Sequence, residues 1–168
     1  GSGSGIYSAY APTNVNGTVY FVASDGINGI ELWKSDGTAA GTVMVKDINP
    51  GSSGSMSWGK SPLFTNVNGT LYFRANDGTN GEELWKSDGT AAGTVMVKDI
   101  KPGSANSDIS SLTNLDGILL FTATGAIGFN ELWKSDGTAA GTIMVKDINP
   151  SGGSDPSSLT AANGTLYF

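Results

Sequence analysis

The residues of this chain that could carry out chemistry are carboxylates, because the sequence contains no histidine and no cysteine. Without histidine the commonest general base and metal ligand is missing, and without cysteine there is no thiolate nucleophile and no Cys-ligated zinc. Serine and threonine hydroxyls are plentiful, but no histidine can activate them, and no glycine-rich loop opens a phosphate-binding helix. The sequence therefore predicts no catalytic residue, no cofactor-binding residue and no cofactor.

Three aspartates stand at one repeated position, in the turns with the sequence Ser-Asp-Gly-Thr: Asp36, Asp88 and Asp136. Their carboxylates could contact a ligand or an ion. The alternative is that each one accepts backbone N–H groups inside its own turn, while the following glycine takes a positive φ. Such a turn role must recur in every copy, as these residues do, so we expect turn-forming aspartates.

Two other loops, residues 25–29 and 77–81, place Asp and Asn oxygens near Glu31 and Glu83. Calcium favours hard oxygen ligands, but the spacing differs from that of an EF-hand loop. The third copy, residues 124–128, contains neither Asp nor Asn. A metal site shared by every copy is therefore excluded, and calcium binding by the Asp25 and Asp77 loops is left to calorimetry.

Four tryptophans are candidates for contacts with a ligand. Trp33, Trp85 and Trp133 recur at one strand position and could stack on sugars, but a fixed aromatic per repeat more often packs between neighbouring repeats. Trp58 lies in the longest Gly/Ser loop, residues 51–60, and has no counterpart in the other copies. We therefore take Trp58 as the candidate for an exposed ligand contact; the alternative is that it caps the first open blade.

The elements that position these residues are three copies of one segment, residues 31–48, 83–100 and 131–148. The copies begin 52 and 48 residues apart and differ only at Ile143, which replaces a valine. A period in this range indicates a solenoid, a propeller or an array.

Each copy is expected to contain four short antiparallel strands. Asn-Gly or Asp-Gly turns, which are the strongest short hairpin signals, precede strands at 18–23, 70–75, 118–123 and 165–168. We also expect strands at Glu-Leu-Trp-Lys, at 43–48 and its equivalents, and at 61–67, 110–115 and 157–162. Apolar residues fall on both faces of these strands, as in a sheet that lies between two others. The pattern is that of an all-β fold, a β-propeller with four-stranded antiparallel blades.

The motif, in its three copies Glu31 to Thr38, Glu83 to Thr90 and Glu131 to Thr138, resembles the ELWxxDGT repeat family. The resemblance covers about residues 6 to 168. It implies the β-propeller architecture of large bacterial proteins and a secreted or cell-surface location, but it carries no common activity over to this chain.

We divide the chain into a linker (1–5), three blade repeats (6–61, 62–109 and 110–156) and an extra hairpin (157–168). Propellers typically close with four to eight blades. Three blades should not close alone, so we expect a head-to-tail homodimer that forms a six-bladed ring. The alternative is a fragment of a longer propeller.

The net charge of −6 argues against partners that carry phosphate, both nucleic acid and anionic lipid. The expected function is that of a non-enzymatic structural or interaction repeat module, a self-assembling scaffold whose near-identical copies indicate recent duplication or engineering. The runner-up is a carbohydrate-binding, lectin-like propeller with one weak site per blade. A glycoside hydrolase is a distant third candidate. Such an enzyme needs two carboxylates that lie close together in space, and a single sequence does not reveal such a pair. The sequence leaves the localisation open.

Overall fold

The computed structural model describes residues 11–57, 60–61 and 63–168, and over these residues the chain is all-β, with fourteen strands and no helix. The strands form three four-stranded antiparallel sheets and one two-stranded sheet. Sheet 1 contains β1 (Thr13–Val15), β2 (Thr18–Ser24), β3 (Ile30–Ser35) and β4 (Val43–Lys46). Sheet 2 contains β5 (Thr65–Val67), β6 (Thr70–Asn76), β7 (Glu82–Ser87) and β8 (Val95–Lys98). Sheet 3 contains β9 (Ser110–Leu115), β10 (Ile118–Thr124), β11 (Asn130–Ser135) and β12 (Ile143–Lys146). The terminal hairpin consists of β13 (Thr160–Ala162) and β14 (Thr165–Tyr167).

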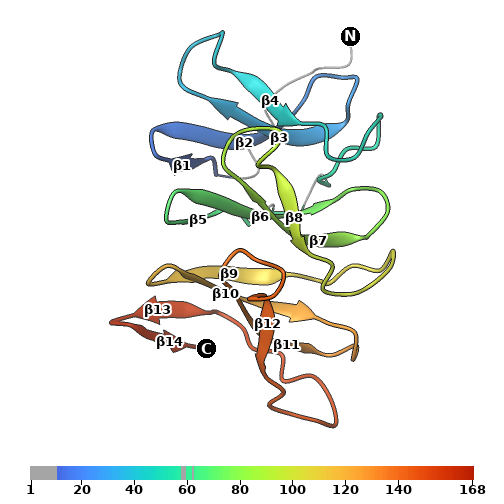
Figure 1. Ribbon diagram of the computed structural model, residues 1–168, viewed down its shortest axis with the longest axis vertical. Helices are drawn as coiled ribbons and strands as arrows, with labels where there is room; N and C mark the ends of the chain where they lie inside the picture. The colour runs from blue at the N-terminus through green and yellow to red at the C-terminus, as the bar shows by residue number, and fades with distance from the viewer. Residues whose placement is uncertain (1–10, 58–59, 62) are drawn as a thin grey trace.

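The sheets are stacked in one row in chain order, from sheet 1 to the terminal hairpin (Figure 1). The first strands of the successive sheets, β1, β5, β9 and β13, are neighbours along one side of the row. The structure thus confirms the repeated antiparallel sheets. The row is open, and no sheet closes into a ring within the described residues.

The four hairpin turns between the first two strands of each unit have the backbone that the sequence predicts. Asn16 and Gly17 have φ values of 53° and 86°, and the φ values of the corresponding residues in the other three turns are also positive. Two successive positive φ values are the requirement of a type I′ turn, which asparagine, aspartate and glycine meet most easily. These turns fix the register of each hairpin, for example Thr13 opposite Tyr20.

Several strands have bounds that differ from the predicted ones. The strand expected at 43–48 ends at Lys46, because Ile48 donates its N–H to the Glu31 side chain instead of to a sheet ladder. The strand expected at 61–67 begins only at Thr65, after Leu63, whose φ of 59° interrupts an extended chain. The last two strands are likewise shorter than expected, at Thr160–Ala162 and Thr165–Tyr167.

The hydrophobic core lies between the sheets rather than inside any one of them. One cluster joins Val45 and Ile48 of sheet 1 to Leu71 and Phe73 of sheet 2. A second joins sheet 2 to Phe121 and its neighbours in sheet 3 in the same manner. Sheet 2 therefore uses one face against sheet 1 and the other against sheet 3, as in repeat proteins whose units contact only their neighbours.

Candidate functional site

The three repeated glutamates are fully buried, with 0% of each side chain exposed: Glu31, Glu83 and Glu131. Glu31 accepts hydrogen bonds from the backbone N–H groups of Ile48 (3.2 Å) and Ser55 (2.7 Å) and from the Ser55 hydroxyl (2.5 Å). The carboxylate thereby holds the loop that follows β4 against the start of β3. Glu131 makes the same contacts with Ile148 and with the amide and hydroxyl of Ser154.

Burial raises the pKa of two of these glutamates, Glu31 and Glu83. Desolvation raises the pKa of Glu31, and hydrogen bonds from Ser55 and Ile48 oppose the rise. Desolvation raises the pKa of Glu83 to about 7, with a smaller contribution from the negative charge of Asp99. A raised carboxyl pKa is also a property of general acids in catalysis, but a catalytic acid must reach substrate, and no part of the Glu83 side chain reaches solvent.

The turn aspartates have the local role that their repetition predicts. Oδ1 of Asp88 accepts hydrogen bonds from the Thr90 N–H (2.8 Å) and the Thr90 hydroxyl (2.7 Å), and these bonds lower the pKa of Asp88. The same pair of bonds occurs at Asp36 and Asp136. The carboxylate closes its own turn.

The loops considered for calcium are closed by hydrogen bonds of the same kind. Both carboxylate oxygens of Asp77 are engaged, Oδ1 by the N–H groups of Thr79 and Asn80 and Oδ2 by the Asn80 side chain. Asp25 repeats this arrangement with Asn28. Over the described residues no group of three or more acidic side chains could hold a metal ion.

Two of the three repeated tryptophans, Trp85 and Trp133, lie between sheets, whereas Trp33 of sheet 1 is partly buried. Trp85 is 6% exposed in the core between sheets 1 and 2, and Trp133 packs against the second cluster and donates its indole N–H to the Ala123 carbonyl (3.1 Å). This is the packing role that their fixed strand position favours. Trp58, the candidate ligand contact, lies outside the described residues.

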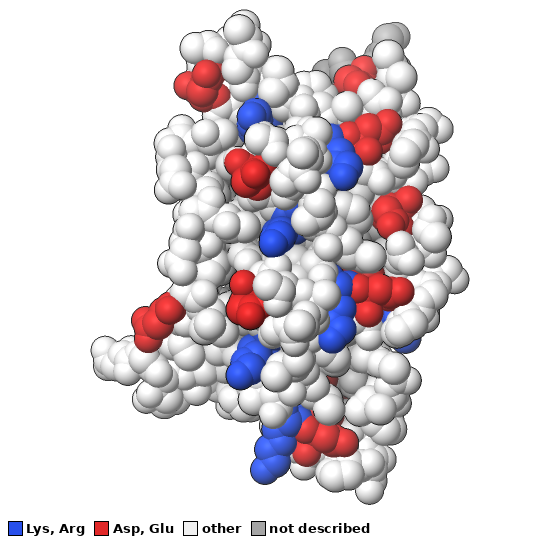
Figure 2. Space-filling view, in the orientation of Figure 1, with Lys and Arg blue, Asp and Glu red and all other residues white. Residues whose placement is uncertain are grey.

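Lysines that sequence reasoning missed connect each sheet to the next. Lys34 and Lys46 of sheet 1 donate to the Gly89 carbonyl (2.7 Å) and the Thr94 carbonyl (2.8 Å) of sheet 2. Lysine and acidic side chains accordingly recur along the whole row of sheets (Figure 2). The signal in the sequence was the Lys of Glu-Leu-Trp-Lys, which is unchanged in every copy.

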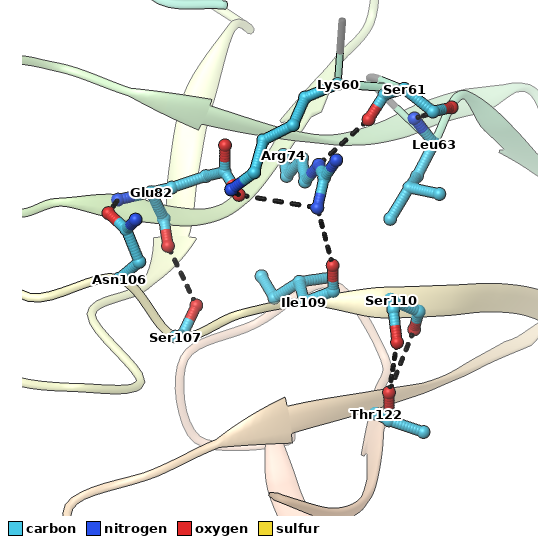
Figure 3. A network of polar contacts seen from close by, with 10 residues as sticks. All are labelled: Lys60, Ser61, Leu63, Arg74, Glu82, Asn106, Ser107, Ile109, Ser110 and Thr122. Carbon is cyan, nitrogen blue, oxygen red and sulfur yellow. Dashed lines mark hydrogen bonds and ion pairs between the residues drawn. The ribbon is translucent and has the colours of Figure 1, made fainter. Parts of the chain in front are cut away.

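One polar network breaks the repeat symmetry, and it centres on Arg74, the single arginine of the sequence. Arg74 donates from Nε to the Ser61 carbonyl (2.8 Å) and from Nη1 to the Ile109 carbonyl (3.0 Å), and Nη1 lies 3.4 Å from Glu82. Lys60 adds a second ion pair to the same Glu82 oxygen (Figure 3). The network ties the entry of sheet 2 to the first strand of sheet 3.

The described part of the chain also contains two shallow depressions of ligand-binding size. One, of about 290 Å³, is bordered by Lys34, Asp36 and Gly41, and another of about 320 Å³ is bordered by the equivalent Lys134, Asp136 and Gly141. Both lie beside a turn aspartate and combine charged groups with aliphatic ones.

Comparison with known proteins gives no match among protein-family models, curated proteins or solved structures. Within the described part of the chain, no helix of a length and hydropathy suited to crossing a membrane is present.

Proposed function

We propose that this chain is a non-enzymatic structural and interaction module, a section of a β-propeller whose end sheets associate with further sheets. The observation that carries the proposal is the use of the repeated polar residues. The buried glutamates hold loops, the turn aspartates close turns, and the lysines hold neighbouring sheets together. Between neighbouring sheets these groups already have partners in the fold, so the repeat is built to stack on itself.

The propeller geometry is supported by the sheets themselves. Each has four antiparallel strands in chain order, and their first strands lie side by side. Blades around a central axis have this arrangement. The resemblance of the Glu-Leu-Trp-Lys-Ser-Asp-Gly-Thr motif to the ELWxxDGT repeat family supports the same geometry.

Light scattering over a range of protein concentrations tests the proposal. We expect a particle larger than the 17.1 kDa chain that dissociates on dilution. A folded monomer at every concentration would contradict it.

The depressions beside Asp36 and Asp136 favour carbohydrate binding as the second candidate, because a carboxylate and a lysine beside aliphatic groups can hold a sugar through hydrogen bonds and apolar contact. A glycan array tests this candidate. Binding that is lost in D36A and D136A, but kept in the exposed-turn variant D116N, would favour a lectin over a scaffold.

A further inference from the structure

We propose that the partner of the end sheets is a second copy of this chain, bound head to tail so that sheet 3 of one copy packs on sheet 1 of the other. Two copies joined at both ends form a six-bladed ring. The inference rests on the proposed function and names its partner and the contacts between the copies.

The contacts between sheets occur twice inside the chain, and they give the template for the proposed interface. One lysine of each sheet donates to the turn-glycine carbonyl of the next, and a second donates to a threonine carbonyl and lies over a tryptophan ring. The four hydrogen bonds are Lys34 to Gly89 (2.7 Å), Lys86 to Gly137 (2.8 Å), Lys46 to Thr94 (2.8 Å) and Lys98 to Thr142 (2.7 Å). The ring contacts are Lys46 with Trp85 (5.8 Å) and Lys98 with Trp133 (5.9 Å).

Sheet 3 presents one half of this template to solvent. Its lysines at the same positions, Lys134 and Lys146, are exposed. Val145 and Ile148 are each 47% exposed, whereas the equivalent residues of sheets 1 and 2 are 3–6% exposed. These side chains are apolar because the same position is buried in sheets 1 and 2. Among the residues that the structure describes, no outer half of a following sheet covers them here.

Sheet 1 presents the other half. The carbonyl-bearing residues Gly37 and Thr42 are exposed, while Thr94 and Thr142 at the Thr42 position are 0% exposed in sheets 2 and 3. Phe21 is half-buried, whereas its equivalents Phe73 and Phe121 are fully buried.

The two halves differ in chemistry, and this difference sets the direction of binding. Sheet 3 offers two ammonium donors, and sheet 1 offers two carbonyl acceptors with the Trp33 ring beside them. Two sheet 3 faces would bring like charges together, so a symmetric contact between like ends is unfavourable. Donor against acceptor gives a heterologous interface, which closes when the rotation completes a circle.

The terminal hairpin occupies part of the position that the second copy needs. Thr113 donates to the Leu159 carbonyl (3.2 Å) as Thr65 donates to the Leu112 carbonyl (3.4 Å), so β13–β14 lies where the first two strands of a following sheet would lie. Within β13 and β14 only Leu166 is partly buried. The β1–β2 hairpin of the second copy pairs at three positions, as β13–β14 does, but its β2 is anchored further because it also pairs with β3 at six positions. We therefore expect the second copy to displace β13–β14, which acts as a removable cap.

Charge reversal at one end and added bulk at the other test the interface in the full chain. K146E removes the donor, and T42K places a long cation where Thr94 and Thr142 have no room. Each should raise the dimer dissociation constant about a hundredfold or more, because both interfaces of the ring lose a charge-assisted bond worth about tenfold each. K101E, which makes the same charge change at a lysine outside the template, should change the constant by less than about threefold. Circular dichroism and urea midpoints at low concentration check that all variants fold.

Mixing the variants separates head-to-tail binding from other arrangements. K146E and T42K should each be monomeric alone, while an equimolar mixture should form a one-to-one dimer through the single intact interface. Self-association of T42K alone, an unchanged dimer in K146E, or a wild-type oligomer of another size overturns the proposed interface. A wild-type chain that never associates overturns the proposed function as well, so the two failures are distinguishable.

The cap is tested by L166D, which weakens the hold of β14 on sheet 3. Native mass spectrometry should then show more dimer than the wild type at equal concentration. Less dimer in L166D would mean that β13–β14 is part of the interface, and it would overturn the displacement.

Discussion

The substitution E83Q tests whether a buried charge is the main weakness of sheet 2. Burial raises the pKa of Glu83 to about 7, from 4.5 for an unhindered glutamate. Oε2 accepts the Ile100 N–H at 2.9 Å, while Oε1 is buried without a hydrogen bond. Glutamine keeps the shape and the acceptor for Ile100, and it removes the charge that burial and Asp99 disfavour.

The sign and size of the effect follow from proton linkage. A group with a pKa that is higher in the folded state binds its proton more tightly there, so its stabilising contribution is present below pH 4.5 and is lost as the pH rises through 7. For this shift, the wild-type chain should lose about 2 to 3 kcal/mol of unfolding free energy between pH 5 and pH 8 through Glu83. The E83Q chain lacks this contribution. The unfolding free energy of E83Q minus that of the wild type should therefore increase by the same amount as the pH rises.

Urea unfolding followed by tryptophan fluorescence at pH 5, 6, 7 and 8 measures the difference. D116N is the matched control, because it removes one carboxylate at an exposed turn where the other three turns have asparagine. An E83Q-minus-wild-type difference that stays constant from pH 5 to pH 8, within the variation of D116N, would refute the reasoning.

Three further predictions concern the turns and the asymmetric network. T94V should cost about 1–2 kcal/mol by breaking a buried hydroxyl network, and T42V, which changes the same bonds at an exposed position, should cost less in urea unfolding of the monomer. R74V should destabilise the chain by about 2 kcal/mol by leaving the nearly buried Glu82 with only the exposed Lys60 as its ion-pair partner, and E82I by a similar amount by leaving Arg74 without its carboxylate. The double variant should cost less than the sum, which a double-mutant cycle measures. Calorimetry with calcium against a chelator should show no binding heat, because both carboxylate oxygens of Asp77 already accept hydrogen bonds.

Local rules predict the turns of this fold well, because the turn residues need nothing from the rest of the chain. Asn16 and Gly17 adopt positive φ values as the dipeptide predicts, and Asp88 closes its turn with a residue two positions away. The period-2 pattern likewise predicts strands that are apolar on both faces. The turns have their partners within a few residues, whereas the partners of the apolar strand faces lie in neighbouring sheets.

Strand ends depend on distant partners and could not be read from the pattern. β4 ends at Lys46 because Ile48 binds Glu31, which lies 17 residues earlier in the chain. The run of β-branched residues predicts a strand up to Ile48, and nothing local reveals the competing acceptor. The role of Glu31 was missed for the same reason. The available signal was a carboxylate that recurs in an otherwise apolar strand. Only the structure shows that this carboxylate is buried and accepts a hydrogen bond from a loop N–H.

The network around Arg74 could not be predicted by comparing the repeats, because its residues differ between the copies. A repeat alignment directs attention to what is constant, and Arg74 and Glu82 stand where sheet 1 has Val22 and Ile30. Both valine and isoleucine lie in the core between sheets 1 and 2. An ion pair in one copy thus replaces an apolar pair in another, which is a paired change that only a structure brings together.

One departure from the repeat bears directly on the strength of the proposed ring. The Tyr20 and Tyr72 hydroxyls lie against Gly89 and Gly137 of the following sheet so closely that a Cβ would not fit. Sheet 3 has Leu120 at this position, which brings no hydroxyl to the turn of the next copy. The interface between copies therefore keeps the lysine bonds and the apolar contact but lacks the tyrosine hydroxyl that packs against the turn in the internal interfaces. It should be the weakest contact in the ring and the first to open on dilution, while each set of three sheets stays folded.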